Sequence, residues 1–131
     1  MKIGFIGLGN VGSKLSGSLL RNGFDVSVYD LNSQLMVEFA KKGAKIGENP
    51  EHLMNFCDIV ITCLPSPAAS NMVMQAMLPF VKEGKTWLEM STTDDAEVKR
   101  LGAEVISRGG KAVDCPVSGG CHRADTGNIS I

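Results

Sequence analysis

Two patterns of apolar residues alternate along the chain. Short runs rich in Ile, Val, Phe and Leu are typical of strands buried in a sheet, and they occupy 2–7, 25–29, 44–46, 58–64, 86–90 and 111–114. Longer segments between them carry apolar residues at helical spacing, and these are 11–22, 32–42, 49–56, 68–77 and 94–107.

Residues at the segment ends support these assignments. Gly23 and Gly43 each follow a helical segment, where glycine commonly ends a helix. Asn49-Pro50-Glu51 combines a capping side chain, a proline at the first helical position and an acid in the first turn. Strands that alternate with helices predict an α/β fold with a parallel sheet covered on both faces.

The predicted fold is a Rossmann-type, doubly wound parallel sheet of six strands. Right-handed crossovers place the strands in the order 3-2-1-4-5-6. We expect one dinucleotide-binding domain over 1–131, because no linker, repeat or low-complexity segment interrupts the pattern.

A glycine-rich loop joins the first strand to the first helix. Gly7, Gly9 and Gly12 have G-x-G-x-x-G spacing, which suits a tight turn, a close approach to pyrophosphate and close helix–strand packing, respectively. Backbone N–H groups and the positive end of the helix dipole then face the phosphates. The predicted cofactor-binding residues of this loop are Gly7, Leu8, Gly9, Asn10, Val11 and Gly12.

Asp30 ends the second strand, 18 residues after Gly12. A carboxylate at this place accepts hydrogen bonds from the adenosine ribose and repels a 2′-phosphate. The next residues, Leu31, Asn32 and Ser33, supply no cation for such a phosphate. These features predict NAD rather than NADP as the cofactor. The alternative is that the glycines form only a turn and that Asp30 caps the next helix.

Composition excludes several classes of protein. Of 131 residues, 44% are hydrophobic and 21% charged, and the net charge is −1 with no basic block, so we expect no nucleic-acid partner. The apolar runs are too short to cross a bilayer and the N-terminus lacks signal-peptide features, so we expect a cytoplasmic protein without membrane contact. Four cysteines without C-x-x-C spacing and two histidines predict no metal site, and Cys63 is expected to be a buried free thiol.

Three segments follow later strands, at the edge where an open α/β sheet binds its ligand. They are 64–66, 91–93 and 116–120, and they offer small residues, hydroxyls and free backbone groups. The hydroxyl of Ser91 either caps the next helix or contacts a ligand. For Thr92 we favour ligand contact.

Four motifs together resemble the β-hydroxyacid dehydrogenases, the family of 3-hydroxyisobutyrate dehydrogenase and, more distantly, 6-phosphogluconate dehydrogenase. They are GFIGLGNVG at 4–12, CLP at 63–65, MST at 90–92 and DCPVSGG at 114–120, in the family's order over the whole chain. The resemblance implies NAD-dependent oxidation of a small 3-hydroxy acid to a semialdehyde. It also implies that Leu64, Pro65 and Thr92 contact the cofactor near its nicotinamide, and that the substrate is held by Ser118, Gly119 and Gly120.

Two positions depart from the family pattern. The family's cofactor-contacting Asn after Leu-Pro falls on Ala69, although Asn71 is close. Arg123 stands where the family usually has Gly, and it is either a cation near an anionic substrate or a solvated surface residue.

The family's acid/base is a Lys in an all-helical second domain, which the resemblance places beyond Ile131. We therefore expect no catalytic residue in this chain, and we interpret its lysines, including Lys85, as solvated surface groups. His122 beside the substrate turn is more readily a bystander than a replacement base. The segment 129–131 predicts the start of a strand, and exposed apolar surface next to a missing domain predicts a homo-oligomer.

Two other functions stay open. One is a non-catalytic module that binds or senses NAD. The other is an NADPH-preferring reductase of semialdehydes or imines, against which Asp30 argues.

Overall fold

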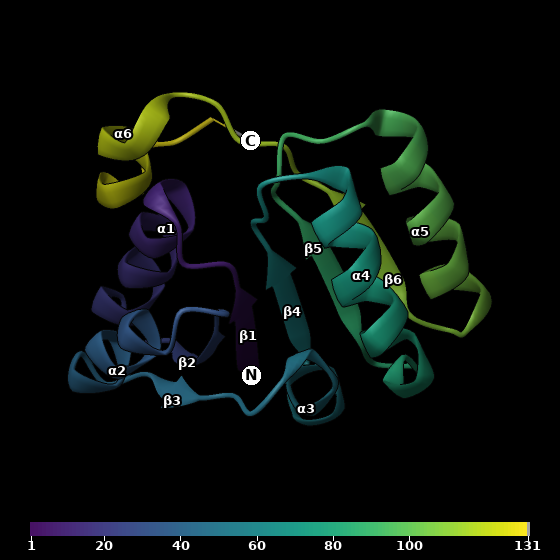
Figure 1. Ribbon diagram of the computed structural model, residues 1–131, viewed down its shortest axis with the longest axis horizontal. Coiled ribbons are helices and arrows are strands. Elements are labelled where there is room, and N and C mark those ends of the chain that lie inside the picture. Colours follow the sequence, from purple (N-terminus) through teal and green to yellow (C-terminus); the bar gives the residue numbers. More distant parts are fainter. Residues whose placement is uncertain (131) are drawn as a thin grey trace.

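The computed structural model describes residues 1–130 and contains six strands, six α-helices and one short 3₁₀ helix in that range (Figure 1). The elements are β1 (Lys2–Ile6), α1 (Asn10–Arg21), β2 (Asp25–Tyr29), α2 (Ser33–Lys41), β3 (Lys45–Ile46), α3 (Pro50–Phe56), β4 (Ile59–Thr62), α4 (Pro67–Met77), η1 (Leu78–Phe80), β5 (Thr86–Glu89), α5 (Asp95–Ser107), β6 (Lys111–Asp114) and α6 (Gly120–Thr126).

The sheet is parallel throughout and its strand order is β3-β2-β1-β4-β5-β6, which confirms the predicted double winding. The last residue of β1, Ile6, is level with Tyr29 of β2 and Thr62 of β4, and Thr62 is level with Glu89 of β5. The loops that leave these strands therefore start from one edge of the sheet, beside the central strand (Figure 1).

Two apolar clusters cover the two faces of the sheet. One joins β-strand residues such as Trp87 to α3, α4, η1 and α5, and the other joins residues such as Phe5 to α1, α2 and α6. The central strands β1 and β4 thus bury both of their faces, as their almost continuous apolar sequences predict, whereas the edge strands β3 and β6 are largely exposed.

Side chains begin most of the helices. The amides of the first turns of α2, α3, α4 and α5 donate to Asn32, Asn49, Ser66 and Asp94, respectively. The predicted start at Asn49-Pro50-Glu51 is confirmed, and the cap of α5 is Asp94. Ser91 therefore does not cap α5.

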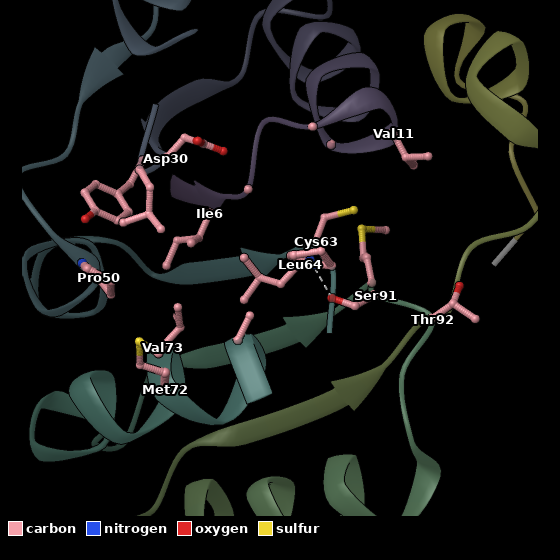
Figure 2. A pocket seen from close by; sticks show the side chains of 18 of the residues that line it. Ile6, Val11, Asp30, Pro50, Cys63, Leu64, Met72, Val73, Ser91 and Thr92 are labelled. Carbon is pink, nitrogen blue, oxygen red and sulfur yellow. Dashed lines mark hydrogen bonds between the residues drawn. The ribbon is translucent and has the colours of Figure 1, made fainter. Parts of the chain in front are cut away.

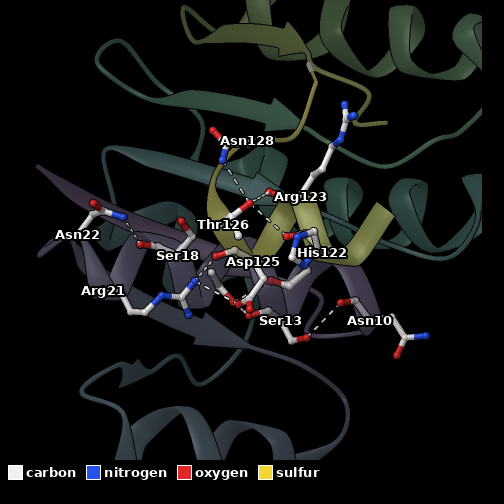
Figure 3. A network of polar contacts seen from close by, with 12 residues as sticks. Asn10, Ser13, Ser18, Arg21, Asn22, His122, Arg123, Asp125, Thr126 and Asn128 are labelled. Atoms are coloured by element: carbon white, nitrogen blue, oxygen red, sulfur yellow. Dashed lines mark hydrogen bonds and ion pairs between the residues drawn. The ribbon is translucent and has the colours of Figure 1, made fainter. Parts of the chain in front are cut away.

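Helix α6, which the hydrophobic pattern does not predict, packs on α1 (Figure 3). Its Ala124 is fully buried, and the guanidinium of Arg21 donates to the backbone carbonyl and the carboxylate of Asp125. Ser118 and Ser130 pair in an isolated antiparallel bridge, while Ile131, the last residue of the predicted strand, lies outside the described residues.

Lys85 is not the solvated residue that the sequence suggests, because only 9% of it is exposed. Its Nζ donates to the carbonyl oxygens of Asn55 at 2.7 Å and Cys57 at 2.9 Å. These carbonyls lie at the end of α3, where helical carbonyls lack intrahelical partners. Burial lowers the pKa of Lys85 below its ordinary value. Within residues 1–130, no helix is long and apolar enough to cross a membrane.

Candidate functional site

A cleft of about 790 Å³ lies at the carboxyl edge of the sheet (Figure 2). Its walls are the glycine loop, the ends of β1, β2, β4 and β5, and one side of α4. This is where open α/β sheets bind ligands. The predicted residues that line it are Gly7, Gly9, Asn10, Val11, Gly12, Asp30, Leu64, Pro65 and Thr92.

Two of the loop glycines are required by packing. Gly7 has a φ of +100°, and a Cβ there would lie 2.1 Å from the carbonyl oxygen of Cys63. A Cβ on Gly12 would lie 2.0 Å from the carbonyl oxygen of Gly7. Any side chain at either position would collide with backbone, so these glycines allow the loop to pass close to β4 and α1.

Gly9 is different, because a Cβ on it would meet nothing within 4 Å. Its φ of −68° is also open to other residues. Packing in the protein therefore does not explain a glycine here. A ligand that approaches the backbone at this point does explain it.

The start of α1 presents unpaired amides to the cleft. Gly9 is the N-cap, it contributes no side-chain cap, and the first turn has no acidic residue. The first amides of a helix have no intrahelical acceptor, and the helix dipole makes this end favourable for an anion. Helices α2, α3, α4 and α5 each have a side-chain cap. Helix α1 has none, so its first amides are available to bind a phosphate.

Asp30 joins the glycine loop to the end of β2. Its Oδ2 accepts from the amide of Leu8 at 2.7 Å and its Oδ1 accepts from the amide of Asn32 at 2.8 Å. Asn32, not Asp30, caps α2. Each carboxylate oxygen has a second acceptor position, so the hydroxyls of a ribose in the cleft can still be bound.

Leu8 is the one predicted loop residue that does not line the cleft. Its side chain is 1% exposed and packs in the core, and its amide is already bonded to Asp30. Its place in the site is thus to hold the loop against Asp30.

The other end of the cleft is formed by Leu64, Pro65 and Thr92. Ser91 also lines the cleft, and its Oγ accepts from the amide of Leu64 at 2.7 Å (Figure 2). Ala69 lines the cleft, whereas the side chain of Asn71 accepts from Arg100 at 2.8 Å. That the family's cofactor-contacting Asn falls on Ala69 stays a prediction.

The predicted substrate residues, Ser118, Gly119 and Gly120, are exposed and lie just outside the cleft, which Val117 reaches. Gly119 and Gly120 have φ values of +121° and +75°, so the turn into α6 has a backbone that favours glycine. The side chain of Arg123 is exposed. The role of the Ser-Gly-Gly turn stays a prediction.

Ionisable side chains of the cleft, among the residues described, are Tyr29, Asp30 and Cys63. Burial, with a smaller contribution from Glu89, raises the pKa of the Cys63 thiol to about 11. The thiol therefore stays protonated at neutral pH, whereas the thiolate is the form that acts as a nucleophile. Asp30 is held by the loop amides at the other end of the cleft.

Several cleft residues were not identifiable as site residues from their type. Ile6, Tyr29, Cys63 and Met90 read as strand residues, and they reach the cleft because each lies at or next to the carboxyl end of its strand. They can be identified from the predicted strand order, because it brings the carboxyl ends of these strands together at one edge of the sheet. Met72, Val73 and Ala76 come from one side of α4, and nothing in their spacing separates ligand contact from core packing.

The fold and the cleft define a dinucleotide-binding α/β protein, and comparisons specify its family. The model of the NAD-binding domain of 6-phosphogluconate dehydrogenase matches residues 2–131. The chain belongs to this family. NAD is the cofactor of the family, and the bare end of α1, the open space at Gly9 and the Asp30 carboxylate fit it.

The chain spans less than half the length of three proteins to which it is similar. Human cytokine-like nuclear factor N-PAC is 35% identical over 133 residues, which are 99% of this chain and 24% of N-PAC. Rat mitochondrial 3-hydroxyisobutyrate dehydrogenase is 34% identical over 132 residues, 98% of this chain and 39% of the relative. The structure of Mycobacterium tuberculosis 3-hydroxyisobutyrate dehydrogenase with L-serine is 27% identical with a TM-score of 0.90, covering 98% of this chain and 44% of that one.

Proposed function

We propose that this chain binds NAD and presents its nicotinamide for hydride transfer to or from a small 3-hydroxy acid. The observation that carries the proposal is the bare helix start at Gly9, with an open backbone and no competing acid, opposite the Asp30 carboxylate. The family supports the cofactor. The similarity to 3-hydroxyisobutyrate dehydrogenases supports the reaction class.

Different residues of the cleft bind different parts of the cofactor. Amides at the start of α1 bind the diphosphate, Asp30 binds the adenosine ribose, and Leu64, Pro65 and Thr92 border the nicotinamide. Bound NAD supplies the hydride acceptor. The protein's part is to orient it and to exclude water with the apolar side chains that follow β4 and β5 and with those of α4.

The substrate class is proposed from the Ser-Gly-Gly turn beside the Leu64 end of the cleft. A hydroxyl and glycine amides suit a carboxylate. L-serine, named with the M. tuberculosis relative, has a carboxylate and a 3-hydroxyl group. The proton acceptor is expected from the part of the relatives that lies beyond the matched segment, since the described cleft offers none near Leu64.

A second candidate is a non-catalytic module that binds NAD. N-PAC, at 35% identity over nearly the whole chain, is named as a nuclear factor and not as an oxidoreductase. This candidate predicts NADH binding without turnover of any 3-hydroxy acid by the complete protein. It also leaves a nuclear location open beside the cytoplasmic one predicted from the sequence. Self-association stays a prediction under both candidates.

Calorimetric titration of the chain with NADH and with NADPH tests the proposal. We expect NADH to bind more tightly, because Asp30 opposes a 2′-phosphate. Asp30→Ala should weaken NADH binding about 10-fold or more through loss of charge-assisted hydrogen bonds. Asp25→Ala, at the exposed beginning of the same strand, is the matched control and should bind as the parent does.

No binding of NADH by the parent at millimolar concentration would contradict the cofactor assignment. Binding by Asp30→Ala equal to that of the parent would contradict the ribose assignment. Oxidation of 3-hydroxy acids by the complete protein separates the enzyme from the binding module.

A further inference from the structure

Beside the Leu64-Pro65 segment lie two polar residues, Glu89 and Ser91, that are not among the predicted cofactor-binding residues. We propose that Glu89 and Ser91 are positioning residues, which fix this segment for the nicotinamide end of NAD. The inference rests on the proposed cofactor-binding function.

Glu89, Ser91 and Leu64 form a chain of hydrogen bonds from β5 to the loop after β4. Glu89, fully buried at the end of β5, accepts from the amide of Ser91 through Oε1 at 2.8 Å. The Oγ of Ser91, a residue that is 4% exposed, then accepts from the amide of Leu64 at 2.7 Å (Figure 2). The Leu64 side chain in turn lies against the glycine loop, with Cδ2 3.3 Å from the position of a Cβ on Gly7.

The segment needs such a support because the sheet stops just before it. The last backbone bonds between β4 and its neighbours at this edge run from Cys63 to Ile6 at 2.9 Å and from Met90 to Thr62 at 2.8 Å. After these, the loop is attached at Leu64 through Ser91 and at Ser66, whose Oγ accepts from the amide of Ala69 at 3.1 Å. A loop fixed at both ends is preorganised, so less conformational entropy is lost when a ligand binds against it.

Stability alone does not explain the Glu89 carboxyl group. Its Oε2 is buried and has no hydrogen-bond partner among the residues described. A buried carboxyl with one oxygen unpaired costs free energy that an apolar side chain of similar size would not cost. The group is therefore better explained by what Oε1 does, which is to hold the Ser91 amide and so direct the Ser91 hydroxyl toward Leu64.

Two ligands separate positioning from general stability. NADH contains the nicotinamide, and ADP-ribose contains the diphosphate and the adenosine ribose but lacks the nicotinamide. We expect the parent to bind NADH more tightly than ADP-ribose. Ser91→Ala should weaken NADH about 3- to 10-fold, the effect of one lost hydrogen bond, and leave ADP-ribose unchanged.

The Glu89 variants provide an independent test. Glu89→Gln keeps an acceptor for the Ser91 amide and should bind both ligands as the parent does. Glu89→Met lacks the acceptor and should reproduce the selective loss of NADH affinity. Thr93→Ala is the matched control, because the Thr93 hydroxyl is buried nearby in the sequence without a partner among the described residues.

The outcomes are distinct. Equal weakening of both ligands by Ser91→Ala, or no weakening of either, would overturn the proposal, as would equal binding of NADH and ADP-ribose by the parent. If Ser91→Ala does not fold, the comparison of Glu89→Met with Glu89→Gln decides. A parent chain that binds neither ligand would overturn the proposed function itself, and the positioning role with it.

Discussion

Substitution of Gly9 by alanine is expected to weaken cofactor binding without weakening the fold. An alanine methyl group there meets no atom within 4 Å and needs no unusual φ, so the fold accommodates it. A more restricted unfolded chain favours alanine by about 0.4–1 kcal/mol. Alanine is a poorer N-cap than glycine by a similar amount. The two effects offset each other, and we expect the free energy of unfolding to change by less than about 0.5 kcal/mol.

NADH binding should respond very differently. The methyl group would occupy the open space beside the first amides of α1, where the diphosphate is expected. Displacing one charge-assisted hydrogen bond costs about 1.5–3 kcal/mol, which corresponds to a loss of affinity of roughly 10- to 150-fold. Calorimetry measures the affinity. Urea unfolding followed by the fluorescence of Trp87, the sole tryptophan and 1% exposed, measures the stability.

Two other glycines serve as controls. Gly12→Ala would place a methyl group 2.0 Å from the carbonyl oxygen of Gly7, so it should destabilise the fold by about 2 kcal/mol or more. Gly102→Ala lies in α5, where its Cβ makes an ordinary contact of 3.5 Å, so NADH affinity should not change. Parent-like NADH affinity in Gly9→Ala, or a loss of stability equal to that of Gly12→Ala, would refute this reasoning.

The buried and surface polar groups give four further predictions. At about pH 8 a small thiol reagent should modify the exposed Cys121 and spare Cys63, because burial raises the pKa of Cys63 to about 11. In Cys121→Ser at higher pH, bound NADH should protect Cys63, which lines the cleft, from the reagent. Lys85→Met should cost about 1–3 kcal/mol in urea unfolding by leaving two carbonyls unpaired. Because the pKa of Lys85 is lowered in the folded state, parental stability should rise as pH increases toward 10.5, a rise that Lys85→Met lacks. Arg21→Ala should change global stability by less than about 1 kcal/mol but speed hydrogen exchange in α6, since its ion pair with Asp125 is exposed; unchanged exchange would contradict this role.

Much of the fold was predictable because local signals agree with one another. The apolar runs, the cap at Asn49 and the glycine loop indicate element boundaries that are consistent with one another. The strand order follows from right-handed crossovers. Helix α6 was not predictable, since it is short and its stability comes from packing Ala124 on α1. The burial of Lys85 depends on the end of α3 lying beside β5, which no local pattern records.

The site was predictable where chemistry depends on residue type at fixed spacing, as for Gly9 and Asp30. It was not predictable where neighbouring strands bring residues together. Ser91 has the sequence context of a helix cap, and only the pairing of β4 with β5 brings its hydroxyl to the amide of Leu64. Cys63 and Met90 likewise resemble other strand residues until the sheet edge is known.

The proposed cofactor site depends most on contact between the diphosphate of NAD and the amides at the start of α1. Amide proton–nitrogen NMR spectra of the isotope-labelled chain, titrated with NADH, measure this directly. We expect the amides of Gly9, Asn10, Val11 and Gly12 to shift most and to saturate together. Unchanged signals from these amides, while others shift and saturate, would contradict it.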